Sequence, residues 1–265
     1  MIFVIDIGNT HTVAGIYDQR RITKQWRIKT DSAMTADELK ISYHNLFSIS
    51  NVDVSQITAV IFSSVVPQLD AAYFSCCTSL FELVQKPACI NVTADIVADL
   101  ITILLEHPAE VGADRLVNGI AAFHLSQSSS IVIDFGTAIT FDCISESCEY
   151  MGGLILPGLS IALQALTQNT AKLPQIDITT PPEKIIGTST VSAMKSGVLY
   201  GYGAMVEGLI QQIKQEMDPE NSRNIAIIAT GGMAKLIQSY ATSIERVEPN
   251  LTLNGLALIY QKLYA

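Results

Sequence analysis

The chain contains one short phrase twice, and this repetition constrains the fold more than any other feature. The first copy runs from Ile2 to Thr12 and the second from Ile131 to Thr140. Each is an apolar run typical of a buried strand, followed by Asp-x-Gly and by a Thr six positions after the Asp. Repetition of a segment usually reports duplicated structure. The sequence therefore predicts two similar halves, each beginning with a buried strand that ends at a polar turn.

The polar turns of the two copies contain residue types that suit ligand binding. A glycine permits a sharp turn and close approach of a ligand to the backbone. Hydroxyls and exposed N–H groups can hold phosphate oxygens, and a neighbouring carboxylate can hold a cation directly or through water. Asp-x-Gly after a strand is also an ordinary hairpin turn, but the repetition of the polar tip favours a binding site. The residues matched by spacing are Asp6, Gly8 and Thr12 in the first copy and Asp134, Gly136 and Thr140 in the second.

Length and charge restrict the class of protein. At 265 residues, 49% of them apolar, the chain can bury one large or two medium cores. The net charge of −9 argues against nucleic-acid binding by phosphate neutralisation, although it does not exclude nucleotide binding. A short polar linker at residues 126–130 precedes the second phrase. We therefore expect an N-terminal domain over residues 1–127 and a C-terminal domain over residues 128–265.

The N-terminus and the cysteines indicate a cytoplasmic protein. No basic stretch precedes the first apolar run, and Asp6 interrupts that run, so we expect no signal peptide. No apolar stretch reaches about 18 residues, so we expect no membrane span. The five cysteines include no Cys-x-x-Cys pair, which favours reduced thiols, with Cys76 and Cys77 as core residues of a helix.

Periodicity and capping signals predict alternating strands and helices in both halves, which is typical of a layered α/β fold. In the first half they predict three strands within 2–29, a capped helix over 35–46, a strand over 57–65, a helix from Pro67 to about Gln85, a strand over 88–92 and a helix that residues 111–115 open and that runs to about 125. In the second half they predict strands over 131–134, 139–144, 150–156 and 225–229, helices over 159–167, 190–217 and 251–264, and a loop over 171–183.

Asp114 and Arg115 at the start of a predicted helix are the best candidates for direct chemistry. An acid in the first turn of a helix is also favourable for electrostatic reasons, by about 0.3–1 kcal/mol. The functional interpretation is a general base, because an alcohol that attacks a phosphoryl group must lose its proton. Arg115 could hold a carboxylate substrate with its guanidinium fork, or could form a surface salt bridge. The sequence leaves these alternatives open.

Other motifs carry less information about function. The chain has no Gly-x-x-x-x-Gly-Lys phosphate loop, and Gly201-Tyr202-Gly203 falls inside a predicted helix, where helix packing explains it better than dinucleotide binding. Thr230-Gly231-Gly232 follows a buried strand and could support a nucleotide on bare backbone, or could be a simple turn into a helix. The four histidines form no metal or catalytic pattern, and only His11 lies within a repeated phrase.

Taken together, these motifs resemble those of the superfamily of actin, sugar kinases and heat-shock chaperones, and within it the type III pantothenate kinases. The motifs occur in the family's order along the whole chain. The resemblance implies two duplicated ribonuclease H-like domains, the actin-like ATPase fold, with ATP bound in a cleft between them. The segments that carry the resemblance are residues 6–10, 110–115, 134–138, Gly152-Gly153, Pro157-Gly158, Gly187, Thr190 and 230–232.

The resemblance also implies an activity: ATP-dependent phosphorylation of pantothenate to 4′-phosphopantothenate, the first step of coenzyme A biosynthesis, in a homodimer. Asp114 would be the catalytic base. Asp134 would bind a monovalent cation, K⁺ or NH₄⁺, and Asp6 would organise Mg²⁺, through water. The residues implied to bind ATP are Asp6, Ile7, Gly8, Asn9, Thr10, His11, Thr12, Val13 and Thr137. Those implied to bind pantothenate are Gly112, Ala113, Asp114, Arg115 and Thr190.

One departure and two alternative functions accompany the resemblance. Leu105 stands where similar sequences often carry a Tyr, which puts one pocket contact in doubt. An accessory or regulatory ATP-binding protein of the same fold is one alternative, since relatives have been labelled transcriptional activators, but the acidity speaks against DNA binding. A kinase for another small alcohol is the second, because the fold determines the nucleotide site better than the acceptor.

Overall fold

The computed structural model describes residues 1–81 and 88–264. Contacts between these residues group into two compact units. Unit 1 comprises Met1–His124 and Asn250–Ala265, and unit 2 comprises Leu125–Pro249. The domain boundary between residues 127 and 128 stays a prediction. The C-terminal helix contacts the strands of unit 1.

Unit 1 is built on a five-stranded sheet in the order β3-β2-β1-β4-β5. The three predicted N-terminal strands form an antiparallel meander, and β4 and β5 run parallel to β1. The sheet therefore combines a hairpin half with a crossover half, which is the arrangement of a ribonuclease H-like domain. Its strands are β1 (Ile2–Ile7), β2 (His11–Asp18), β3 (Arg21–Lys29), β4 (Ala59–Ser64) and β5 (Ala88–Asn91).

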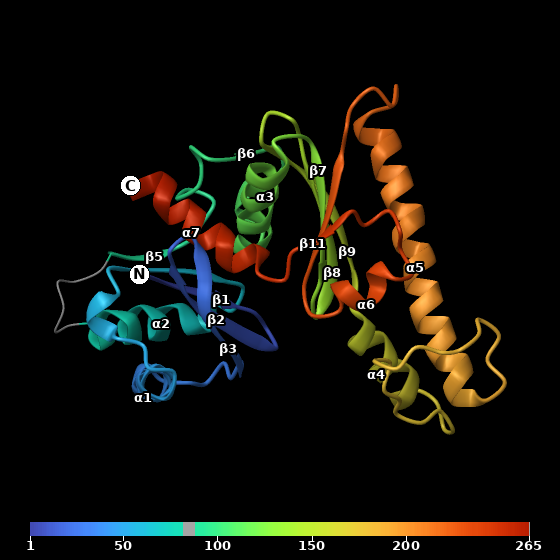
Figure 1. Ribbon diagram of the computed structural model, residues 1–265, viewed down its shortest axis with the longest axis horizontal. Helices are drawn as coiled ribbons and strands as arrows, with labels where there is room; N and C mark the ends of the chain where they lie inside the picture. Colours follow the sequence, from blue (N-terminus) through green and yellow to red (C-terminus); the bar gives the residue numbers. More distant parts are fainter. Residues whose placement is uncertain (82–87, 265) are drawn as a thin grey trace. The chain divides into compact units, whose positions relative to one another are not determined.

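Alternation along β1 separates the two faces of this sheet. Phe3, Ile5 and Ile7 belong to a core that includes residues of α1 (Ala36–Ile49) and α2 (Pro67–Leu80). Successive side chains of a strand point to opposite faces, so Asp6 projects from the other face. On that side α7 (Leu251–Tyr264) contacts β1 and β4, and Figure 1 shows α7 and the pair α1 and α2 on opposite sides of the strands.

Local signals define the starts of the first two helices as predicted, although α1 ends three residues after the predicted end at Leu46. The Thr35 hydroxyl accepts from the Glu38 N–H at 3.3 Å, and the Glu38 carboxylate accepts from the Thr35 N–H at 2.9 Å, which is a capping box. Pro67 begins α2, where its missing N–H costs nothing. Cys76 and Cys77 are buried in α2, as expected. The helix ends at Leu80, and the final part of the prediction, to Gln85, lies outside the described residues.

The connection from β5 to the next long helix contains only short elements. They are β6 (Thr102–Ile103) and the 3₁₀ turn η2 (Pro108–Glu110), and a similar turn, η1 (Val54–Gln56), precedes β4. The sequence left residues 93–110 without a clear prediction. After η2 comes α3 (Ala113–Ser126), which starts within the predicted opening segment 111–115 and ends one residue after the predicted end. A Cβ added at Gly255 of α7 would lie 2.8 Å from Val117 of α3, so these helices pack closely.

Unit 2 repeats the sheet of unit 1. Its strands lie in the order β11-β10-β7-β8-β9. The pairs β7–β8 and β8–β9 are antiparallel and the pairs β7–β10 and β10–β11 are parallel, as in unit 1. This repeat confirms the predicted fold of two duplicated ribonuclease H-like domains. The strands are β7 (Ser130–Phe135), β8 (Ala138–Ile144), β9 (Glu149–Pro157), β10 (Ala226–Thr230) and β11 (Arg246–Val247).

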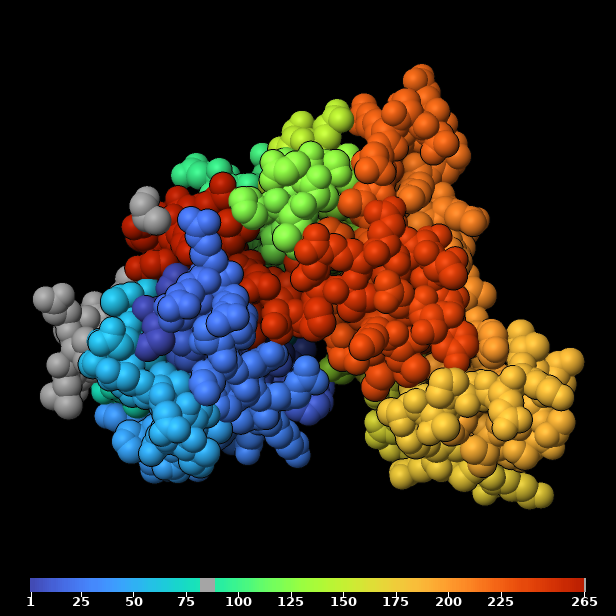
Figure 2. Space-filling view, viewed as in Figure 1, coloured from blue at the N-terminus to red at the C-terminus, as the bar shows by residue number. Residues whose placement is uncertain are grey.

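Helices α5 (Thr190–Met217) and α6 (Ala234–Gln238) share a core with the β7 residues Ile131, Ile133 and Phe135. Asp134 therefore projects from the other face, just as Asp6 does in unit 1. Between α4 (Leu159–Gln168) and α5 runs the predicted loop, and Figure 2 shows this segment as a yellow lobe. No helix among the described residues is both long and apolar enough to cross a membrane.

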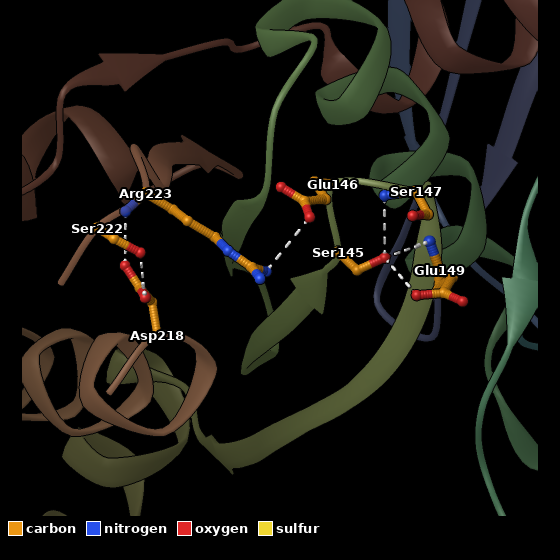
Figure 3. A network of polar contacts seen from close by, with 7 residues as sticks. All are labelled: Ser145, Glu146, Ser147, Glu149, Asp218, Ser222 and Arg223. Carbon is orange, nitrogen blue, oxygen red and sulfur yellow. Dashed lines mark hydrogen bonds and ion pairs between the residues drawn. The ribbon is translucent and has the colours of Figure 1, made fainter. Parts of the chain in front are cut away.

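Polar contacts tie the turn of the β8–β9 hairpin and the connection from α5 to β10 into one network (Figure 3). Asp218, which ends α5, accepts a 2.7 Å hydrogen bond from the Arg223 N–H and one of 3.2 Å from the Ser222 hydroxyl. The Arg223 guanidinium lies 3.5 Å from the Glu146 carboxylate in the hairpin turn. Both side chains of this ion pair are more than half exposed, so its contribution to stability is small, about 0–1 kcal/mol.

Candidate active site

The carboxylate of Asp6 lies at the end of β1, where the first repeated phrase turns. Ser63 stands opposite Asp6 on the parallel strand β4. The Ser63 hydroxyl is completely buried and donates a 2.9 Å hydrogen bond to Oδ1 of Asp6. The carboxylate is thus held in place, yet it remains partly exposed. This suits a group that binds Mg²⁺ directly or through water, because Mg²⁺ takes few protein oxygens and keeps several waters.

The turn after Asp6 is tight and polar. The Gly8 N–H donates to the carbonyl oxygen of His11 at 3.2 Å. A Cβ added at Gly8 would lie 2.9 Å from the same oxygen, so only glycine fits without displacement. Asn9, Thr10 and His11 are exposed. The turn therefore presents backbone and short polar side chains to solvent, as a phosphate-binding turn must.

Thr12 points into unit 1. Its side chain is completely buried, and its hydroxyl lies 3.0 Å from the Thr30 hydroxyl and 3.4 Å from that of Tyr73. Burial raises the pKa of the Tyr73 phenol, so this group stays protonated and can donate. The hydroxyl of Thr12 thus supports the turn from behind, whereas its contact with ATP, like that of Val13, stays a prediction.

Asp114 lies in the first turn of α3. Its Oδ1 accepts a 2.8 Å hydrogen bond from the Arg115 N–H. Burial raises the pKa of the Asp114 carboxyl, and the N–H and the charge of Arg115 oppose this increase. A raised carboxyl pKa moves an aspartate towards the range in which a general base works well at neutral pH.

Gly112 leaves room for this carboxylate. A Cβ added at Gly112 would lie 2.6 Å from Oδ1 of Asp114. The Gly112 carbonyl oxygen accepts from the Arg115 N–H at 3.1 Å, which begins the helix. Gly112, Ala113 and Arg115 are all partly exposed. The segment thus contains four of the five residues that the family resemblance implies for pantothenate binding.

Asp134 is the penultimate residue of β7 in unit 2 and has hydroxyl residues on both neighbouring strands. Thr140 of β8 and Thr230 of β10 stand opposite it. Gly231 has φ of +88°, and a Cβ there would overlap Oδ1 of Asp134 and lie 2.7 Å from the Phe135 nitrogen. Because Gly231 has no side chain, the Thr230-Gly231 turn leaves room for the Asp134 carboxylate. One carboxylate among neutral oxygens suits a cation of low charge.

The strand pairing corrects one match that sequence spacing suggested between the two repeated phrases. Spacing alone matched Thr12 with Thr140, but Thr12 pairs with Ile7, whereas Thr140 pairs with Asp134. The first turn is one residue longer: the Gly8 N–H bonds the carbonyl of the third residue after it, and the Gly136 N–H that of the second. Val13 is thus the residue beside Asp6. The two carboxylates differ accordingly, since only Asp134 has a hydroxyl on its hairpin partner.

The remaining candidates of unit 2 lie at the turn after Asp134 and at the start of α5. Thr137 is exposed, and its carbonyl oxygen accepts from the Gly158 N–H at 3.1 Å. Thr190 is exposed in the first turn of α5, which Ser189 caps. A Cβ added at Gly187 would lie 2.5 Å from Cα of Ala193, so the preceding loop packs directly on this turn.

Among the described residues, no three His, Cys, Asp or Glu side chains gather in a way that could hold a metal ion by themselves. Asp6 and Asp134 are each single carboxylates, Asp6 with the hydroxyl residue Ser63 on one neighbouring strand and Asp134 with Thr140 and Thr230 on both. A cation at either position would therefore complete its coordination with water or with phosphate oxygens. This is the usual situation of Mg²⁺ in phosphoryl-transfer sites.

Comparison with known proteins identifies the family. The family model of the type III pantothenate kinases matches residues 2–212 of this chain. The chain belongs to this family. It is 47% identical to the type III pantothenate kinase of Desulfotalea psychrophila over 263 residues, which is 99% of this chain and 98% of that one. It is 43% identical to that of Desulfatibacillum aliphaticivorans, over 99% of both chains.

Solved structures agree on the fold. A Campylobacter jejuni protein described as a Baf family transcriptional activator superposes with a TM-score of 0.60, at 17% identity, over 98% of both chains. The ethanolamine utilization protein EutJ of Carboxydothermus hydrogenoformans gives a TM-score of 0.56 at 10% identity, over 97% of this chain and 89% of that one. At such identities the likeness shows the fold alone.

Sequence reasoning missed the residues that hold the family's motifs in place. Ser63 orients Asp6, and Thr30 with Tyr73 supports the turn from behind. Ser63 belongs to a predicted strand, and only its pairing with β1 gives it a role. Thr30 follows β3 in an unremarkable polar stretch. Thr30 could have been identified by combining two predictions: that β3 pairs with β2, and that a polar turn follows Asp6.

Proposed function

We propose that this type III pantothenate kinase transfers the γ-phosphoryl group of ATP to the 4′-hydroxyl of pantothenate. ATP is used with a divalent metal ion, as in kinases generally. The product, 4′-phosphopantothenate, begins the synthesis of coenzyme A. The observation that supports this most is the family match over residues 2–212 together with the raised pKa of Asp114 within the motif.

The proposed reaction assigns a separate role to each group. The pantothenate hydroxyl oxygen attacks the γ-phosphorus, the bond to the β-phosphate oxygen breaks, and the hydroxyl proton passes to Asp114. Gly112, Ala113, Arg115 and Thr190 would bind pantothenate, with the Arg115 guanidinium suited to its carboxylate. Residues 6–13 and Thr137 would bind ATP. Asp6 would organise Mg²⁺, which neutralises charge on the phosphates when bound.

An ADP-release assay against a panel of small alcohols tests this function. We expect ADP release that depends on pantothenate and saturates with it. Similar rates with another alcohol as acceptor would favour the second candidate, a kinase with a different substrate. ATP binding without any acceptor-dependent turnover would favour an accessory ATP-binding protein.

We also propose that Asp134 binds a monovalent cation, K⁺ or NH₄⁺. Replacing KCl with tetramethylammonium chloride should lower the rate by about tenfold or more, because an ion that offsets phosphate charge is lost. Initial rates at equal ionic strength measure this effect. The variant Asp134→Asn should be slow in both salts. Equal rates of the unmodified enzyme in the two salts would exclude the cation role.

A homodimer through α5 is the last part of the proposal. A Cβ added at Gly197, Gly201 or Gly208 meets nothing within 4 Å, so this face of the helix is open. These glycines and Ala204 recur on one side of α5, where small residues permit close approach of a second helix. Large apolar side chains are exposed elsewhere in the same unit, including Ile155 at 69% and Ile186 at 80%. Both features support contact with a second copy.

A further inference from the structure

Thr30 sits directly behind the turn that the proposed function assigns to the ATP phosphates. It follows β3 and makes three hydrogen bonds to the first repeated phrase. Its hydroxyl donates to the Gly8 carbonyl oxygen at 2.7 Å, its N–H donates to the Thr10 carbonyl oxygen at 3.0 Å, and its hydroxyl oxygen lies 3.0 Å from that of Thr12. Two of the carbonyl groups of the turn are therefore held by one residue.

The direction of these hydrogen bonds can be assigned. Thr30 has one hydroxyl proton, and the 2.7 Å bond to Gly8 uses it, so the Thr12 hydroxyl donates to Thr30. The Tyr73 hydroxyl in turn donates to Thr12 at 3.4 Å, and that of Tyr43 donates to Tyr73 at 3.5 Å. A chain of four hydroxyls thus runs from the core of unit 1 to the Gly8 carbonyl. Chains of this kind strengthen their members cooperatively.

Fixing the carbonyl groups also fixes the direction of amide protons. No peptide bond among the described residues is cis, and a trans peptide is planar, with its N–H antiparallel to its C=O. Because the Gly8 carbonyl points to Thr30, the N–H of Asn9 points away from Thr30. The N–H of His11 points away for the same reason, since the Thr10 carbonyl accepts from Thr30. Both donors are thereby oriented on the side of the turn opposite Thr30.

We propose that Thr30 is a positioning residue for ATP, which orients the backbone N–H groups of the 8–11 turn toward the phosphates. It does not touch the nucleotide. The Thr30 hydroxyl keeps the Gly8–Asn9 peptide in one orientation, so that the donors are ready before ATP arrives. This inference rests on the proposed function, because it requires that the turn binds phosphate.

The variant Thr30→Val tests the proposal, since it replaces the hydroxyl by a methyl of similar size and leaves the backbone N–H. We expect the Kd for Mg-ATP, measured by calorimetry, and the KM for ATP to rise about tenfold, the effect of losing one well-made hydrogen bond. The KM for pantothenate should change less than about twofold, a split that a general loss of structure would not produce. A Kd for ATP within twofold of the unmodified enzyme would overturn the proposal.

Two further variants control the experiment. Thr23→Val makes the same change within β3, the strand that precedes Thr30, where the Thr23 hydroxyl donates to the Ile16 carbonyl at 3.2 Å, away from the turn. It should leave the Kd unchanged, and a loss equal to that of Thr30→Val would contradict the proposal. Thr30→Ser keeps the hydroxyl and should bind ATP nearly normally; tenfold weaker binding there would also contradict it. If the unmodified enzyme itself does not bind ATP, the proposed function fails instead.

Discussion

Replacing Asp114 with Asn should lower kcat by about 100- to 10,000-fold, because the pantothenate hydroxyl loses the group that takes its proton. The Asn side chain keeps the oxygen that accepts the 2.8 Å hydrogen bond from the Arg115 N–H, so the start of α3 should be preserved. Initial rates of ADP release measure the loss. Calorimetry should find the Kd for Mg-ATP within about threefold of the unmodified enzyme, since ATP is assigned to other residues. Near-normal turnover of Asp114→Asn would remove Asp114 from the base role.

The pKa of Asp114 adds a pH dependence to this prediction. Only the ionised carboxylate can act as a base, so kcat/KM should fall as pH decreases through the raised pKa of Asp114. The acid limb should therefore lie at higher pH than the limb of an ordinary aspartate. An acid limb at or below the usual aspartate range would contradict the assignment.

As pH rises, the free energy of unfolding should decrease, whereas kcat/KM should increase. A carboxyl with a raised pKa binds its proton more tightly in the folded protein, so ionisation lowers the free energy of unfolding as pH rises from the unfolded pKa through the folded one. At neutral pH, Asp114→Asn removes this unfavourable charge. Its Tm should equal or exceed that of the unmodified enzyme, which separates lost catalysis from lost folding.

Replacing Gly231 with Ala should lower the free energy of unfolding by about 2–4 kcal/mol. Gly231 has φ of +88°, which an L side chain rarely adopts, and a Cβ would overlap the Asp134 carboxylate and lie 2.7 Å from the backbone nitrogen of Phe135. Denaturant unfolding monitored by circular dichroism measures the change. The added methyl cannot be accommodated by a side-chain rotation alone, because backbone lies in its way.

Gly136→Ala is the matched control for this prediction. Gly136 also lies beside Asp134, but a Cβ there would be 3.4 Å from the Ala138 carbonyl oxygen and 3.6 Å from Oδ1 of Asp134, which are ordinary contacts. Its cost should stay below about 1 kcal/mol. Equal losses for the two variants would show that the Gly231 turn is not shaped around the carboxylate as described.

Much of the fold could be predicted from local signals. The capping box at Thr35 and Glu38 and the range 190–217 of α5 are confirmed, because a cap and a long helical pattern are properties of neighbouring residues. The repeated phrase correctly indicated a duplicated sheet, since each copy contains a strand, a turn and the start of a second strand. Strand β11 was missed, because two residues carry no detectable period.

The supports of the site could not be predicted, because they join distant parts of the chain. Ser63 lies 57 residues from Asp6, and Tyr73 lies 61 residues from Thr12. The false match of Thr12 with Thr140 has a related origin, since counting from the aspartate assumes turns of equal length. Only the strand register shows the extra residue in the first turn. The roles of Asp6, Asp114 and Asp134 themselves stay predictions from the family resemblance.

Product identification by ³¹P NMR tests the central claim most directly. The enzyme is incubated with ATP, Mg²⁺, K⁺ and pantothenate, with Asp114→Asn as a parallel control. We predict equal amounts of ADP and of a new phosphomonoester resonance that belongs to 4′-phosphopantothenate, and almost none with the variant. ADP that appears with inorganic phosphate and without the pantothenate ester would contradict the assignment of this chain as a pantothenate kinase.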